Sequence, residues 1–318
     1  MQALRRRKRP WRWWQVGRWQ PIFSLEGTLT QPFSFCSQAG RFVSSYASTM
    51  SAIPAALTKY PAMRWAAGGW TFFIAENALL SENRTWLIHE LGDERYHLVY
   101  GTLSTMATAS IGYAYYSIRK MAMPPSLTLW TRAPPMLSAP AIGGFVFLSL
   151  GAVMASQAAP KMQIPVALVD SNTSSKTLQV RCPFDFSDKK SHHDESLLLP
   201  PLQGIERITR HPGLWSLGLL GLGQACLAST LPQRIWWCGP AAVAWLGGWH
   251  TDSRFRRGMG GTLSPYYESQ TSNVPFVAIL SGRQGSGSWQ GLVGDLKPLN
   301  ATVAVAASSL WVLRRLAR

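Results

Sequence analysis

The chain has 318 residues, of which 47% are hydrophobic and only 14% are charged, and it contains 15 Trp. A soluble domain carries about 25% charged residues, so this composition and the long apolar stretches point to lipid as the solvent. The net charge of +16 is concentrated in the leader, the connections and the tail, which argues against a nucleic-acid partner.

The N-terminal region is rich in basic residues. The first 75 residues contain ten Lys or Arg and a single acid, Glu26, a composition typical of a transit peptide. The run at 5–9, followed by three Trp, could instead be a basic aromatic patch on an anionic membrane surface. We predict a targeting leader over residues 1–62, which directs the chain to a plastid or mitochondrial membrane, and a membrane domain over 63–318.

Six later stretches approach the length of a transmembrane helix, which needs about 20 apolar residues. They are residues 63–80, 98–118, 135–158, 212–231, 234–250 and 300–313. The predicted fold class is therefore all-α, a polytopic membrane helical bundle of about six transmembrane helices. A soluble bundle is the alternative, but its helices would lack the polar stripe that surface helices need. The polar, aperiodic segment 165–200 is predicted to be a solvent loop.

Six crossings would place both termini on one side of the membrane. That side would carry most of the basic connections, including Arg119, Lys120, Arg132 and Arg234, in agreement with the positive-inside rule. The fourth and fifth helices are separated only by a short turn around Pro232 and Gln233, so they are predicted to be antiparallel neighbours. The four cysteines lack CxxC spacing and nearby His pairs, and indicate neither a zinc site nor a disulfide framework.

The segment GIERITRHP at 204–212 leads directly into the fourth predicted helix. It would bring Arg207, Arg210 and His211 to a helix N-terminus, which already carries partial positive charge. An anion there would resolve the conflict: a lipid phosphate, a haem propionate or the carboxylate of a nucleotide-like cofactor. The simpler alternative is that the arginines contact lipid head groups.

A second polar segment, WHTDSR at 249–254, follows the fifth helix. In an antiparallel hairpin this segment meets the start of the fourth helix, so Asp252 is expected to pair with Arg207 or Arg210. Four histidines are expected near the same membrane face, an arrangement that permits a metal or haem site. They are His89, His97, His211 and His250.

These segments resemble the NnrU-domain membrane proteins. Residues 204–212 resemble the G-x-x-R-x-T-R-H-P signature of that family, and the spacing of Gly92, Arg95, Tyr96, Tyr100 and Ser104 resembles its first-loop motif. Residues 249–254 resemble its post-hairpin motif. The stretch SNVPFVAI at 272–279, with GRQ at 282–284, is similar to the zeta-carotene isomerases. The resemblance covers residues 70–313.

The resemblance implies a b-type haem held by two histidines, which converts the central cis double bond of a polyene to trans. It assigns one axial position to His211 and puts Arg207, Arg210, Asp252 and Trp249 beside the cofactor. The other axial position falls on Asn77, which cannot replace an imidazole as a strong iron ligand. Three outcomes stay open: a substitute ligand such as His250 or His89, five-coordinate haem on His211, or no haem, the last two being equally supported.

Three functions follow. The first is a haem-dependent cis-trans isomerase acting on a carotenoid or another apolar substrate. The second is a non-catalytic membrane subunit or assembly factor of a larger respiratory or photosynthetic complex. The third is a membrane methyltransferase, because such enzymes also place an R-H-P motif at a helix start. Membrane lipid is an expected partner in each case.

Overall fold

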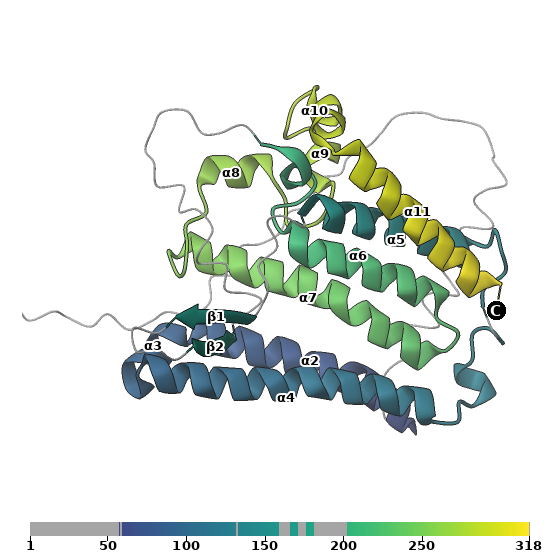
Figure 1. Cartoon of the computed structure of the whole chain (residues 1–318), viewed down its shortest axis with the longest axis horizontal. Helices are drawn as coiled ribbons and strands as arrows, with labels where there is room; N and C mark the ends of the chain where they lie inside the picture. The colour runs from purple at the N-terminus through teal and green to yellow at the C-terminus, as the bar shows by residue number, and fades with distance from the viewer. Residues whose placement is uncertain are drawn as a thin grey trace, which may run out of the picture. The chain divides into compact units, whose positions relative to one another are not determined.

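The computed structural model describes residues 57, 59–131, 133–158, 166–170, 176–180 and 202–317, and most of the predicted leader lies outside them. The described part is predominantly helical, which confirms the predicted helical fold class (Figure 1). Its helices are α2 (Pro61–Glu82), α3 (Arg84–Leu91), α4 (Asp93–Lys120), α5 (Ala139–Ala158), α6 (Pro212–Leu227), α7 (Leu231–Arg256), α8 (Pro265–Gln270), α9 (Val277–Leu280), α10 (Ser288–Asp295) and α11 (Pro298–Leu316), with 3-10 turns η1 (Pro125–Leu127) and η3 (Gly204–Arg207).

A small β-hairpin lies within the segment 165–200, where no regular structure was predicted. Strands β1 (Val166–Asp170) and β2 (Lys176–Val180) pair antiparallel, with Val166 opposite Val180. Both strands contain β-branched residues, which favour extended structure. The remainder of this segment lies outside the described residues.

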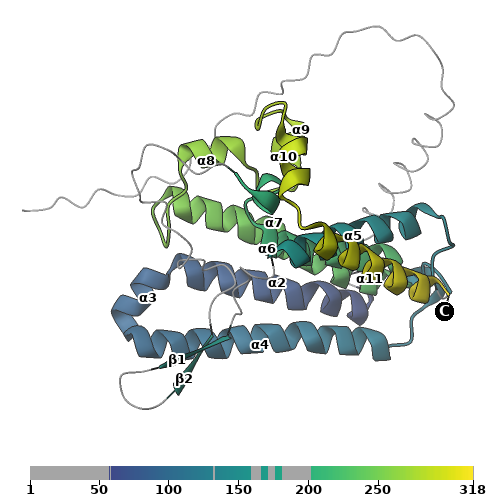
Figure 2. The ribbon, with the colours of Figure 1, turned by 45° about the horizontal axis from the view of Figure 1, so that its top comes forward.

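Helices α2 and α4 form an antiparallel pair and lie side by side in both views (Figure 2). Their backbones approach closely at Gly69, where a Cβ atom would lie 3.1 Å from the carbonyl oxygen of Ser110. The chain turns from α3 into α4 at Gly92, whose φ of 81° is readily adopted by glycine. The Tyr60 and Ser126 hydroxyls are 3.4 Å apart, which joins the start of α2 to the linker after α4.

Helices α5, α6 and α7 pack as successive antiparallel neighbours because small residues line their contacts. A Cβ atom at Gly223 would lie 2.9 Å from the Leu148 backbone nitrogen, and one at Gly221 would lie 2.7 Å from the Trp237 carbonyl oxygen. Helix α11 packs on α5, where the Ser308 hydroxyl donates to the Leu148 carbonyl. Glycine therefore allows this set of helices to approach closely.

The α6–α7 hairpin differs in detail from its prediction. Helix α6 ends at Leu227, and α7 already begins at Leu231, so Pro232 lies in the first helical turn rather than in the connection. Proline suits that position because its missing N–H would be unpaired there. The Thr230 hydroxyl accepts a hydrogen bond from the Gln233 backbone N–H and caps the helix.

One described helix, α5, is long and apolar enough to cross a membrane. A second candidate arises if α10 and α11, which meet at 85°, are taken as one bent span. One or two such helices are weak evidence for a membrane, and the six-span arrangement stays a prediction. Helix α4 has no Asp, Glu, Lys or Arg between Tyr96 and Ile118, but its many Gly, Ser, Thr and Tyr residues lower its hydropathy.

The helical bundle has two ends, which differ in the residues they carry. The histidine end is where α2 ends, α6 begins and α7 ends, as shown by the hydrogen bond between Ser81 of α2 and His250 of α7. The linker end is the opposite one, where α4 ends, α6 ends and α7 begins. There Thr128, in the linker after α4, forms a β-bridge with Thr230.

Candidate functional site

A buried histidine and a buried aspartate meet at the histidine end. His211 is the N-cap residue of α6, and Pro212 occupies the first turn behind it. The His211 Nε2 atom lies 2.8 Å from Asp252 Oδ1 of α7, and the two side chains are only 8% and 5% exposed. The antiparallel hairpin thus brings together two residues that are 41 positions apart.

Arg210 extends this pair into a charged cluster. Its Nη1 atom lies 3.7 Å from Asp252 Oδ2 and 3.9 Å from Glu268 Oε1, and its Nη2 donates to the Thr271 carbonyl at 3.1 Å. Burial lowers the pKa of the Arg210 guanidinium, while Asp252 and then Glu268 act in the opposite direction. Glu268 is also paired with Arg256, which lowers the pKa of the Glu268 carboxyl. We call Arg210, His211, Asp252 and Glu268 the His211 site.

Arg207 has a separate partner. Its Nε donates to Asp295 Oδ2 at 3.1 Å, and the Gly204 backbone N–H donates to the same oxygen at 2.8 Å. These two hydrogen bonds, the backbone one first, lower the pKa of the Asp295 carboxyl. Of the two arginines expected to pair with Asp252, therefore, Arg210 does so, whereas Arg207 ties η3 to the end of α10. Each arginine thus lies beside a carboxylate of the chain, Asp295 for Arg207 and Asp252 for Arg210.

The segment 271–284 is bound over the start of α6. The Arg210 backbone N–H donates to the Ser272 carbonyl at 3.0 Å, and the Phe276 N–H donates to the Ile208 carbonyl at 2.8 Å. Gln284 donates to the Arg207 carbonyl at 2.8 Å. The two sequence motifs that were noted separately are therefore hydrogen-bonded to each other along their length.

Asn273 connects this segment to the two long helices of the hairpin. Its amide oxygen accepts from the Trp215 indole N–H at 3.0 Å, and its amide nitrogen donates to the Trp245 carbonyl, also at 3.0 Å. Gly248 gives the space for this contact. A Cβ atom there would lie 2.4 Å from the Asn273 amide oxygen and 2.9 Å from the His211 ring.

The other predicted histidines are held elsewhere. His250 Nε2 lies 2.7 Å from the Ser81 hydroxyl, and the His89 side chain is 84% exposed beside Glu90. His97 lies 3.6 Å from Asp93 in the first turns of α4. Among the described residues, no three His, Cys, Asp or Glu side chains are grouped as a metal site would need.

Asn77 lies at the position where the resemblance expects the second haem ligand. It is fully buried, and its amide nitrogen donates to Glu76 Oε2 at 2.7 Å and to the Phe73 carbonyl at 2.9 Å. The Tyr100 hydroxyl donates to its amide oxygen at 3.1 Å. Each polar atom of the Asn77 amide thus has a partner within α2 or α4.

Sequence reasoning included Trp249 in the site and missed Asp295. Trp249 is 61% exposed on the surface of α7, outside the His211 site. Asp295 is 88 residues from Arg207, and no motif or spacing links the two. The hydrogen bonds of Asn273 were not predicted either, although Asn273 lies within the segment 272–279, which is similar to the zeta-carotene isomerases.

The structure thus defines a helical-bundle protein with a buried arginine–histidine–aspartate cluster at the start of one hairpin helix. The family model described as NnrU protein matches residues 66–316, and the chain belongs to this family. Comparison with curated proteins and with solved structures finds no match. The family assignment predicted from the four motifs is therefore confirmed.

The residues present do not fit a haem held by two histidines. The His211 Nε2 atom is engaged by a buried carboxylate, and the second axial position is the hydrogen-bonded amide of Asn77. Neither proposed substitute is positioned for the role, since His250 is bonded to Ser81 and His89 is exposed. The Asp252 contact occupies only one ring nitrogen of His211, an arrangement that metal-bound histidines also show. What the described residues lack is the second histidine, so we derive no chemistry through a haem held by two histidines.

Proposed function

We propose that this NnrU-family protein is a non-catalytic membrane subunit or assembly factor of a larger organellar complex. The observation that carries the proposal is the hydrogen bond between His211 Nε2 and Asp252 Oδ1, two side chains that are nearly fully buried. The carboxylate anchors the histidine that the family resemblance assigns to iron through one ring nitrogen, and the second axial position of that resemblance is the hydrogen-bonded amide of Asn77. The charged side chains of the motif then hold the fold together.

The charge balance of the site supports a structural role. The N-terminus of α6 carries partial positive charge, and Arg210 adds a full one. The chain itself supplies the compensating carboxylates from α7 and α8, Asp252 and Glu268. These ion pairs join three segments of the bundle, and two buried nitrogens of Arg210, Nε and Nη1, make no hydrogen bond among the described residues.

Membrane embedding is part of the proposal. Large apolar side chains are exposed on the outer faces of several helices, among them Leu98, Met106, Leu310 and Trp311. Helix α4, with 28 residues, is about 42 Å long and exceeds the bilayer hydrocarbon thickness of roughly 30 Å. These features support membrane embedding with lipid covering the apolar faces. The six-span arrangement and the plastid or mitochondrial location are part of the proposal.

The absorption spectrum of the detergent-purified full-length protein tests the proposal. We expect no Soret band in the wild type after expression with added haem precursor, and none in His211→Ala. A Soret band that disappears in His211→Ala but persists in the matched variant His89→Ala would refute the proposal and support the isomerase. Recovery of the wild-type chain in a stable larger assembly from native membranes is the positive result.

Two enzymatic hypotheses compete with this proposal. The cis-trans carotene isomerase follows from the similarity of residues 272–284 to that family and needs a bound haem. The membrane methyltransferase follows from the R-H-P motif, with Asp252 and Glu268 as its acids. Binding of a methyl donor to the purified protein, measured calorimetrically and lost in Glu268→Gln, would favour the methyltransferase over the scaffold.

A further inference from the structure

The charged side chains are distributed unequally between the two ends of the bundle. At the linker end the described residues include cations but no Asp or Glu: Lys59, Arg64, Arg119, Lys120, Arg234, Arg314 and Arg315. At the histidine end the cations alternate with acids and form ion pairs such as Arg257 with Glu82 and Arg207 with Asp295. The linker end therefore presents uncompensated positive charge.

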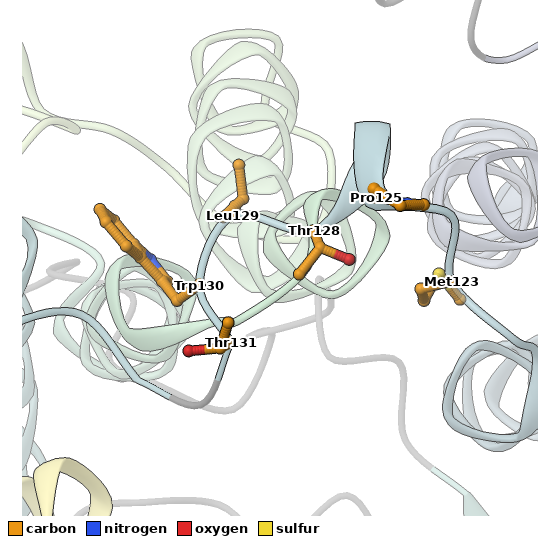
Figure 3. A pocket seen from close by; sticks show the side chains of 6 residues that line it. All are labelled: Met123, Pro125, Thr128, Leu129, Trp130 and Thr131. Atoms are coloured by element: carbon orange, nitrogen blue, oxygen red, sulfur yellow. The ribbon is translucent and has the colours of Figure 1, made fainter.

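A shallow, widely open pocket of about 340 Å³ lies at the linker end (Figure 3). Its lining comes from one curved stretch of chain between α4 and α5, namely Met123, Pro125, Thr128, Leu129, Trp130 and Thr131. This stretch is fixed to the α6–α7 connection, because the backbone N–H groups of Leu129 and Trp130 both donate to the Ser229 carbonyl. The pocket wall is thus anchored to the bundle.

Two buried donors near this pocket have no hydrogen-bond partner. One is the indole Nε1 of Trp130, which belongs to the pocket lining. The other is Nη2 of Arg234, one turn after Thr230, the residue that bridges to Thr128. Buried Trp and Arg donors normally have acceptors, and an unpaired one costs about 1–3 kcal/mol. Unpaired buried donors also occur at Trp70, Arg210 and Arg254. The two at the linker end differ because uncompensated positive charge and the pocket lie beside them, and that charge favours an anion as the acceptor.

Aromatic rings accompany the cations at this end. The Arg119 guanidinium lies 5.9 Å from the Tyr115 ring centroid, and the Lys120 ammonium lies 5.6 Å from that of Tyr116. Aromatic side chains mixed with Lys and Arg are typical of the membrane–water interface. If the linker end lies at such an interface, the anions beside it in the membrane are the phosphates of lipid head groups.

We propose that the linker pocket binds the phosphate head group of an anionic phospholipid. The Trp130 N–H and the Arg234 guanidinium would donate to its oxygens, and the cations of the linker end would attract it. The inference rests on the membrane embedding proposed above, and it adds a specific lipid site to it. The binding surface is separate from the His211 site, which lies at the other end of the bundle.

The test is a lipid titration of the full-length protein in mild detergent, with thermal unfolding followed by circular dichroism. Phosphatidylglycerol should raise the unfolding midpoint in a saturable way, whereas phosphatidylcholine and inorganic phosphate should not. Arg234→Gln and Trp130→Phe should each weaken the apparent affinity about tenfold. Lys297→Gln and Trp86→Phe, matched changes at the histidine end, should leave it unchanged.

Equal responses to the two lipids, or an unchanged affinity in Arg234→Gln, would overturn the inference, as would stabilisation by inorganic phosphate alone. If Trp130→Phe does not fold, lipid retention by Arg234→Gln in native mass spectrometry decides the question. Extraction of the protein from membranes without detergent would instead reject the membrane embedding itself. The two failures are therefore distinguishable.

Discussion

Replacing Asp252 by alanine should destabilise the fold strongly. The change removes the carboxylate that contacts His211 Nε2, at 2.8 Å, and the nearer of the two described carboxylates beside Arg210, at 3.7 Å. Because these side chains are buried, breaking the cluster leaves a charged guanidinium in a poorly solvated site. Removing one partner of a buried ion pair costs about 3–5 kcal/mol.

For a domain of this size, about 1 kcal/mol corresponds to roughly 2–4 °C in the unfolding midpoint. We therefore expect Asp252→Ala to lower the midpoint by about 10 °C or more in detergent, measured by circular dichroism. Asp252→Asn keeps a hydrogen-bond acceptor and should lose less. Asp93→Ala, which removes an exposed carboxylate paired with His97, serves as the control and should change the midpoint little.

A midpoint for Asp252→Ala within about 2 °C of the wild type would show that the buried cluster contributes little to stability. The structural interpretation of the R-H-P motif would then be wrong. An increase in stability would point to a site that is strained for the sake of a ligand or a reaction.

Three further predictions concern other contacts of the bundle. Gly248→Ala should lower the free energy of unfolding by about 1–3 kcal/mol, because the added methyl group overlaps neighbouring side chains. The control Gly112→Ala, where the methyl group enters open space, should raise it slightly. Chemical denaturation measures both. The Arg257 guanidinium lowers the pKa of Glu82 below its ordinary 4.5, so this pair stabilises above pH 4.5 and loses its contribution as the pH falls through the lowered value. Arg257→Gln should flatten this acid dependence by less than about 1 kcal/mol, since the pair is exposed and screened. Asn77→Ala should cost about 1–3 kcal/mol in thermal unfolding by leaving its buried partners unsatisfied.

The helical elements could be predicted from the sequence because apolar length and helix-terminal residues are local signals. Pro212 marked the start of α6, and Arg119 with Lys120 marked the end of α4. The antiparallel hairpin followed from the short connection, which also predicted that Asp252 and Arg210 would meet. These inferences needed only the chain order of the elements and the direction of each helix.

The remaining contacts depend on how elements pack that are distant in the sequence. Arg207 finds Asp295 because α10 folds back onto η3, and His250 finds Ser81 because α2 runs parallel to α7. The imidazole of His211 was expected to be free for a ligand. Its engagement with Asp252 depends on the rotation of α7 about its axis, which the motif spacing did not determine.

An anion was predicted at the start of α6, and two carboxylates of the fold itself lie beside Arg210 there. Asp252 lies on α7 and Glu268 on α8, so the charge balance of this helix end forms only when the tertiary structure forms. Any metal that binds His211 Nε2 must displace Asp252 and leave its carboxylate without its closest partner, at a cost of about 3–5 kcal/mol. By that amount, equivalent to a factor of about 10² to 10⁴ in affinity, the present arrangement disfavours iron at the Nε2 atom of His211, while the Asp252 contact orients the ring and leaves its Nδ1 atom outside this argument.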